Sequence, residues 1–163
     1  MINKHKQKGA ETVEFAVIAL LFFAVIMTVI EFSRALFVWN ALTEATRRGA
    51  RMAVICPYQS PIPKQVAIFD IIAGSLGTSP IVAGLTPAMV SVRYLNLAGA
   101  VETDQTLIRF AEVKITGYTH NLIIPLWGRA VTVPTFTTTL PTESLGAVPT
   151  YPGDPLIAPQ CNF

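Results

Sequence analysis

The chain has 163 residues, of which 52% are hydrophobic and 13% are charged, about half the charged share of a typical soluble domain. This length suits one domain with an appendage rather than two full domains. The composition argues against a freely soluble monomer, and against a disordered chain, which needs low hydrophobicity and high charge. The net charge of +2 is too small to indicate a nucleic-acid-binding protein.

The sequence changes character near Cys56 and Pro57. All twelve prolines lie at or after Pro57. Residues 1–56 contain seven basic and four acidic residues, a net charge of +3, whereas residues 57–163 contain five and six, a net charge of −1. We therefore predict that the main structural boundary lies at this point.

The first region begins with a basic tract and continues into an apolar run. Lys4, Lys6 and Lys8 precede sixteen uncharged residues at positions 15–30. A membrane span needs about 20 apolar residues, a length that the run approaches when residues 12–13 are added. The run therefore predicts a transmembrane helix.

Three interpretations of this segment compete, and the first two do not account for Glu14. A cleaved secretory signal would end in a small-residue cleavage site, but here the apolar run is followed by Glu-Phe-Ser-Arg. An uncleaved membrane anchor explains the length and the hydrophobicity. Neither requires a carboxylate at the apolar edge, where an unpaired charge in lipid is costly. Glu14 either marks the lipid interface or has a partner.

The residues Gly-Ala-Glu-Thr-Val-Glu-Phe at 9–15 resemble the cleavage motif of type IV prepilins, and the glutamate followed by an aromatic residue resembles the Tad (Flp) branch. In that superfamily a membrane peptidase cuts after the glycine. The resemblance implies a leader at residues 1–9, a processing site at Gly9 and Ala10, and a role in assembly or recognition for Glu14 and Phe15. Glu14 would pair with the new α-amine of Ala10, on its own or a neighbouring subunit, since each ion of a buried pair is costly without the other.

Helical spacing of apolar residues continues beyond position 30 and predicts one helix from Thr12 to Ile55, about 65 Å long, which Pro57 ends. One face should pack on the C-terminal domain: Ala35, Val38, Trp39, Leu42, Ala45, Thr46, Gly49, Met52 and Ala53. The opposite face carries Glu44, Arg47, Arg48 and Arg51. Glu44 can pair with the arginines three and four residues later. This face is either solvated or contacts lipid headgroups or a neighbouring subunit.

Residues 31–35 and 40–51 resemble the N-terminal region of TadE-like pseudopilins, in which a glycine is usual where Ser33 stands. The motif residues here are Glu31, Phe32, Arg34 and Ala35. The two resemblances together cover residues 8–55. They imply a pilin-like α+β fold, in which a transmembrane and amphipathic helix at residues 10–56 packs on a small antiparallel sheet in an extracytoplasmic domain at residues 57–163.

The resemblance also implies a function. The chain would be a structural minor pilin or pseudopilin of a Tad-type adhesive pilus, with the prepilin peptidase, other pilin and pseudopilin subunits, the assembly platform of the inner membrane and membrane lipid as partners. Basic residues flank the span on both sides, so charge does not decide its orientation. We expect a cytoplasmic N-terminus, because the N-terminal tract is short and the globular mass lies on the other side. The alternative is an uncleaved membrane-anchored binding module.

Beyond Pro57 the pattern predicts a short helix and three strands. The helix is expected at residues 64–76, two strands at 88–97 and 108–118 with a hairpin connection at 99–106, and a third strand at 131–140. Pro134 should place the third strand at an edge of the sheet. The last twenty residues, with four prolines, predict extended coil.

Two cysteines and two histidines limit the available chemistry. Cys56 and Cys161 either form a disulfide, which would close a loop of about 100 residues and contribute about 4 kcal/mol, or remain free or intermolecular thiols. The sequence contains no HExxH, CxxC, P-loop or GxGxxG motif. His120 is interpreted as a surface or capping residue, and a nucleophilic Cys56–His120 pair is the least favoured alternative. We expect no enzyme activity, no cofactor and no metal.

Overall fold

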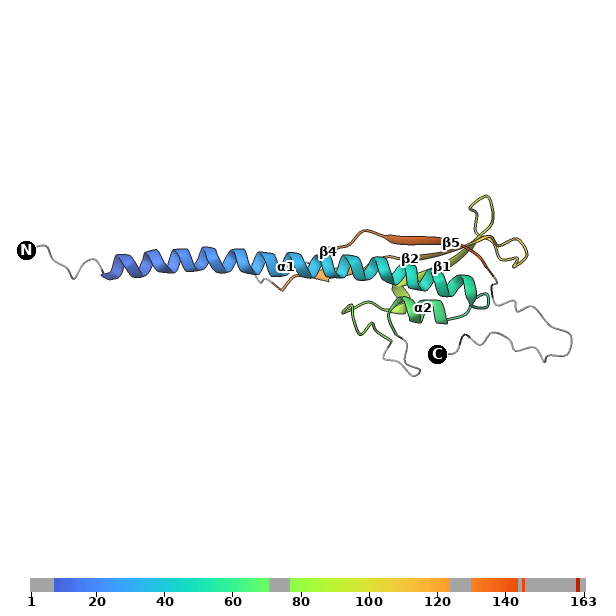
Figure 1. Cartoon of the computed structure of the whole chain (residues 1–163), viewed down its shortest axis with the longest axis horizontal. Helices are drawn as coiled ribbons and strands as arrows, with labels where there is room; N and C mark the ends of the chain where they lie inside the picture. Colours follow the sequence, from blue (N-terminus) through green and yellow to red (C-terminus); the bar gives the residue numbers. More distant parts are fainter. Residues whose placement is uncertain (1–7, 71–76, 124–129, 144, 146–160, 162–163) are drawn as a thin grey trace, which may run out of the picture.

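A single long helix dominates the computed structural model, which describes residues 8–70, 77–123, 130–143, 145 and 161. Helix α1 (Lys8–Ile55) has 48 residues and is therefore about 70 Å long at 1.5 Å per residue. It contains no proline, so no residue interrupts its hydrogen bonding. Its N-terminal half projects alone, and its C-terminal half lies against the rest of the chain (Figure 1). The predicted continuous helix is confirmed.

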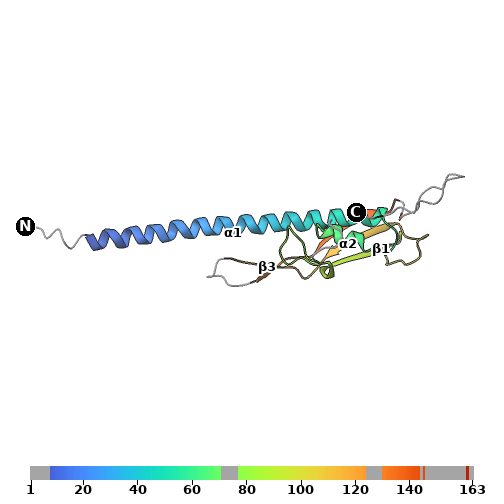
Figure 2. The ribbon, with the colours of Figure 1, turned by 90° about the horizontal axis from the view of Figure 1, so that it is seen from below.

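A three-stranded antiparallel sheet forms the centre of the domain. Its order is β1-β2-β5, with β1 at Val90–Leu95, β2 at Phe110–Ile115 and β5 at Phe136–Pro141. Helix α2 (Ile62–Ala67) follows the turn after α1, and a 3-10 turn, η2 (Pro87–Met89), leads into β1. Both α1 and α2 pack on this assembly (Figure 2). The predicted α+β class, and the two predicted strands that became β1 and β2, are confirmed.

A second, two-stranded sheet was not predicted as such. It pairs β3 (Thr119–Asn121) with β4 (Ala130–Thr132), with His120 opposite Val131. The predicted strand at 131–140 is thus two strands in two different sheets, because Pro134 lies between β4 and β5 and cannot donate a ladder hydrogen bond. The prediction of a sheet edge is confirmed for β5, which pairs only with β2 among the described strands.

The predicted helix at 64–76 is wrong in its bounds. Helix α2 begins at Ile62 and ends at Ala67, because the backbone turns at Phe69 with φ 61° and the amide of Asp70 donates to the carbonyl of Gln65 at 3.0 Å. Residues 71–76 lie outside the described residues. The same is true of the predicted C-terminal coil, apart from Leu145 and Cys161.

The C-terminal half of α1 supplies one wall of the hydrophobic core. Its predicted inner face is confirmed at most positions, and Leu42, Ala45 and Ala53 are fully buried. Trp39 is the exception, because 47% of it remains exposed. Its ring meets the ring of Phe136 on β5 edge to face, with centroids 5.0 Å apart, so that only one side of the indole is covered.

Gly49 marks the closest approach of α1 to its neighbours. A Cβ atom at this position would lie 2.9 Å from the Cβ of Ala67 on α2 and 3.1 Å from a methyl group of Val113 on β2. The carbonyl oxygen of Pro63 would be equally close, at 3.1 Å. The absence of a side chain therefore allows the helix, α2 and the central strand to meet at one point.

We predict that Gly49→Val destabilises the domain, because its side chain has no space between these three elements. Overpacking a well-packed core costs about 1–3 kcal/mol. Chemical denaturation of the detergent-solubilised chain, followed by circular dichroism, measures the effect. Arg51→Val, on the exposed side of the same helical turn, is the matched control and should change stability little. Equal stability of the two variants would contradict the packing described here.

Candidate functional site

The N-terminal half of α1 is apolar and uncovered. From Val13 to Ile30 every large apolar side chain is exposed except Ile26, which is partly exposed. The helix is long and apolar enough to cross a membrane, and none of its most apolar window is buried. Apolar patches of this size are not left in contact with water in soluble proteins. This surface therefore needs lipid or other apolar helices around it.

The polar groups on this half of the helix are compatible with an apolar environment. The hydroxyl of Thr28 donates to the carbonyl of Ala24 at 2.8 Å, and the hydroxyl of Ser33 donates to the carbonyl of Val29 at 2.8 Å. Both hydroxyl protons are thereby satisfied within the helix. Glu14 is exposed and forms no ion pair with any described residue. Its carboxylate stands at the N-terminal edge of the apolar surface.

The predicted processing residues lie in the first turns of α1. Gly9 and Ala10 are exposed, and no described atom lies within 4 Å of where a Cβ of Gly9 would be. Phe15 is also exposed, at 72%. Ala10 and Glu14 are four residues apart, hence about 6 Å along the axis and on the same face of the helix. The domain covers none of these residues, so they are accessible to another protein.

Glu31 marks the point where α1 first contacts the domain, and it is buried, with 8% exposed. One carboxylate oxygen accepts a hydrogen bond from Arg34 at 2.8 Å, and the other accepts one from the backbone amide of Ile123 at 3.0 Å. The imidazole Nε2 of His120 lies 3.5 Å from the first oxygen. These partners explain how a carboxylate can be buried immediately after sixteen uncharged residues.

The interpretation of His120 as a surface or capping residue was wrong. His120 is the inward-facing residue of β3 and is 5% exposed. Its partner Glu31 is 89 positions earlier in the chain, so no local pattern could identify the contact. Thr119, His120 and Asn121 are all polar, so the alternation of exposed and buried residues in β3 has no counterpart in the hydrophobicity of the sequence. Among the described residues, no hydrogen bond or ion pair joins His120 to Cys56, whose sulfur is bonded to that of Cys161.

The other members of the motif around Glu31 have different surroundings. Phe32 is 63% exposed, and Ala35 is partly buried. Arg34 reaches the neighbourhood of Tyr118, whose hydroxyl donates to the carbonyl of Ala83 at 3.1 Å. Burial raises the pKa of Tyr118, and the positive charge of Arg34 opposes this effect. The motif therefore combines a buried acid, Glu31, the arginine that pairs with it, Arg34, and an exposed aromatic ring, Phe32.

The arginine-rich face of α1 is exposed, as predicted, but only one of the two predicted ion pairs is present. Glu44 accepts a hydrogen bond from Arg48 at 3.1 Å, and both side chains are partly exposed. Arg48 also lies 5.1 Å from the ring centroid of Phe69. Arg47 and Arg51 form no ion pair with described residues. An exposed pair of this kind contributes at most a few tenths of a kcal/mol.

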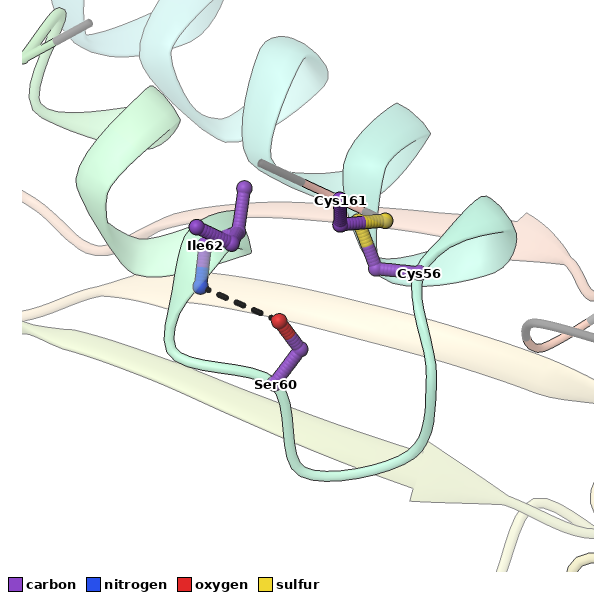
Figure 3. The surroundings of a disulfide bond; sticks show 4 residues. All are labelled: Cys56, Ser60, Ile62 and Cys161. Atoms are coloured by element: carbon purple, nitrogen blue, oxygen red, sulfur yellow. Dashed lines mark hydrogen bonds between the residues drawn. A yellow bond between two sulfur atoms is a disulfide. The ribbon is translucent and has the colours of Figure 1, made fainter. Parts of the chain in front are cut away.

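A disulfide joins Cys56 to Cys161, which is one of the two alternatives left open by the sequence (Figure 3). It lies where α1 ends, beside the turn in which the hydroxyl oxygen of Ser60 accepts a hydrogen bond from the amide of Ile62 at 3.3 Å. The two Cα atoms are 5.8 Å apart and 105 positions apart in sequence. The bridge fixes the end of the chain to the end of the long helix.

Among the described residues, no group of three or more His, Cys, Asp or Glu side chains is arranged to hold a metal ion. The features of the described residues that bear most directly on function are the Glu31 junction, the disulfide and the exposed apolar surface of α1.

A comparison with protein-family models matches the TadE-like protein family over residues 9–51. The N-terminal region of this chain is therefore similar to TadE-like proteins over these residues. The match begins at the predicted processing glycine and includes the exposed span, the Glu31 junction and the first part of the packed helix. No curated protein and no solved structure matches the chain.

We predict that Glu31→Ala loosens the attachment of the β3–β4 hairpin to α1, because it leaves Arg34 and the amide of Ile123 without their common acceptor. Removing one partner from a buried, charged arrangement costs about 3–5 kcal/mol. Hydrogen exchange of the Ile123 amide should accelerate strongly. Glu44→Ala, which removes the exposed ion pair on the same helix, should leave that amide unchanged. Unaltered exchange in Glu31→Ala would show that the carboxylate does not hold the hairpin.

We predict that replacing both cysteines with serine lowers the stability of the domain. Loss of a closed loop of this length removes about 4 kcal/mol in the chain-entropy model. Urea unfolding of the oxidised wild type, the reduced wild type and the double variant measures the difference, and the reduced wild type should match the variant. Free thiols that can be alkylated in the unreduced native protein would contradict the bridge.

Proposed function

We propose that this chain is a minor pilin or pseudopilin of a Tad-type pilus, with a structural rather than an enzymatic role. The observation that carries the proposal is the overlap of two features in the first half of α1. The match to the TadE-like family begins at residue 9, and the helix that follows carries an exposed apolar surface that no described part of the domain covers. A subunit that assembles through helix packing needs such an uncovered helix preceded by an accessible processing site.

In this proposal a prepilin peptidase cuts between Gly9 and Ala10. The cut removes the three lysines of residues 1–9 and creates an α-amine one helical turn from Glu14. The exposed position of Gly9 and the open space around it support access by a peptidase. Recognition would involve Glu14 and Phe15, which are exposed on the same segment.

Glu14 would act after processing as the partner of an α-amine. Its carboxylate is costly in an apolar surrounding when it is unpaired, and it forms no ion pair with described residues of its own chain. A neighbouring subunit that supplies the amine of its Ala10 would neutralise it. Such a pair would set the axial register between subunits, because any other register leaves both ions unpaired.

The same proposal assigns the location and the partners. The precursor would be a single-pass protein of the bacterial inner membrane, with its N-terminus in the cytoplasm and its domain outside. The disulfide is compatible with an oxidising compartment for the domain. The partners would be the prepilin peptidase, other pilin and pseudopilin subunits, the assembly platform and membrane lipid, and the processed subunit would prime or join an adhesive fibre.

We predict that Glu14→Ala abolishes piliation while the precursor is still made and inserted, because the variant loses the partner of the α-amine. Electron microscopy of cells and immunoblots of sheared surface fractions measure the result. Glu11→Ala, an exposed acid in the same turn of α1, is the matched control and should retain more assembly. Normal pili in Glu14→Ala cells would refute the pairing.

The intact mass of the membrane-extracted protein tests processing separately. We expect a product that begins at Ala10 only in cells with the prepilin peptidase. A retained leader in both strains would favour an uncleaved membrane-anchored binding module instead.

A further inference from the structure

Beyond the uncovered span, a band of exposed apolar residues surrounds the Glu31 junction. We call it the junction band. It comprises Phe32, Leu36, Phe37 and Trp39 on α1, together with Ile123 next to β3 and Val131 on β4. Each of these six residues is between 47% and 66% exposed. The hairpin side of the band lies level with the helix side, because the amide of Ile123 donates to the carboxylate of Glu31.

The junction band continues the apolar surface of the span, and Arg34, whose side chain is 38% exposed, is the one partly exposed charge among its described residues. The only acid between them, Glu31, is buried and paired with Arg34. Among the described residues at 32–40, 119–123 and 130–134, no other side chain is charged apart from Arg34 and the buried His120. The connection between β1 and β2, at the other end of the domain, instead carries Asp104 and Arg109 on its surface.

The length of the apolar surface places the band at the edge of a bilayer. From Val13 to Trp39 the helix rises about 39 Å at 1.5 Å per residue. The hydrocarbon core of a bilayer is about 30 Å thick, and the whole bilayer with its headgroups about 40–45 Å. If the span fills the core, the band lies in the interfacial layer, where amphipathic aromatic residues such as tryptophan are enriched.

The distribution of the band around the helix favours lipid over a second protein. At 100° per residue, Trp39 and Phe37 lie on opposite flanks of α1, and the domain lies between them. The hairpin adds a third side, with Ile123 and Val131. A single protein partner covers one side, whereas a lipid interface surrounds the helix on all of them. In the figures β3 and β4 lie on the side of the domain that faces the span (Figures 1 and 2).

We propose that the β3–β4 hairpin rests in the interfacial layer of the bilayer that α1 crosses, so that the junction band docks the domain on the boundary between lipid headgroups and acyl chains. The proposal rests on α1 being a membrane span, as proposed above. In it, Glu31 holds the hairpin at the correct height on the helix. The domain would then have a second membrane contact besides the span and a defined orientation on the membrane surface before assembly.

Nitroxide labels on introduced cysteines test the proposal in the full-length chain, with the native disulfide kept oxidised, in vesicles of phosphatidylethanolamine and phosphatidylglycerol. Ile123→Cys and Val131→Cys place labels in the band. Leu20→Cys, 68% exposed in the middle of the span, and Leu97→Cys, 81% exposed at the other end of the domain, are the references. Electron paramagnetic resonance compares accessibility to oxygen, which concentrates in lipid, with accessibility to a water-soluble nickel chelate.

We expect the ratio of oxygen to nickel accessibility at both band labels to be several-fold higher than at Leu97→Cys and lower than at Leu20→Cys, and to stay constant as the protein is diluted in lipid. A ratio equal to that at Leu97→Cys would overturn the proposal but leave the membrane span intact. If the band labels are protected from the nickel chelate only at high protein density, and this protection disappears on dilution in lipid, the proposal is also overturned. The surface covering the band would then be a second copy of the chain. A water-exposed Leu20→Cys label would overturn both the span and the hairpin contact.

Discussion

One continuous helix has to satisfy two different environments, and the rest of the structure follows from this constraint. The first half of α1 has no protein cover and is compatible only with lipid or with other apolar helices. The second half is the wall of a small hydrophobic core. The helix has no break between the two halves, so its side chains alone determine where the uncovered half ends and the packed half begins. This boundary lies within a few residues of Glu31.

Glu31 can stand at this boundary because its carboxylate has partners both on α1 and in the β3 region. Arg34 belongs to the same helix, and the Ile123 amide and His120 come from the β3 region. A buried carboxylate gives little net stability, but it penalises any arrangement that leaves it unpaired. The hairpin is therefore fixed at one height on the helix. Apolar packing alone would tolerate sliding by a turn, since the exposed surface is apolar both above and below this point.

The features that the sequence predicted correctly are those with local periodic signals. The 3.6-residue spacing identified α1 and its buried face, alternation identified β1 and β2, and a family resemblance identified the N-terminal region. The remainder depends on contacts between distant residues. Trp39 lies on the buried side of the helical pattern but remains 47% exposed beside Phe136, and the three residues of β3 are all polar, so that no alternation identifies the strand. Nor could the contacts of Glu31 with His120 and the amide of Ile123 be inferred, because these residues are about 90 positions away.

Three attachments along α1 hold the domain to the helix. The Glu31 junction holds the end nearest the span, the close approach at Gly49 holds the middle, and the Cys56–Cys161 bridge closes the far end. Each attachment resists a different displacement: sliding along the helix, separation from it, and fraying at its C-terminus. In the proposed pilus role, a subunit drawn out of the membrane by its helix would transmit that force to the domain through these contacts. The Glu31 contact would be loaded first, because it lies closest to the span and is not covalent.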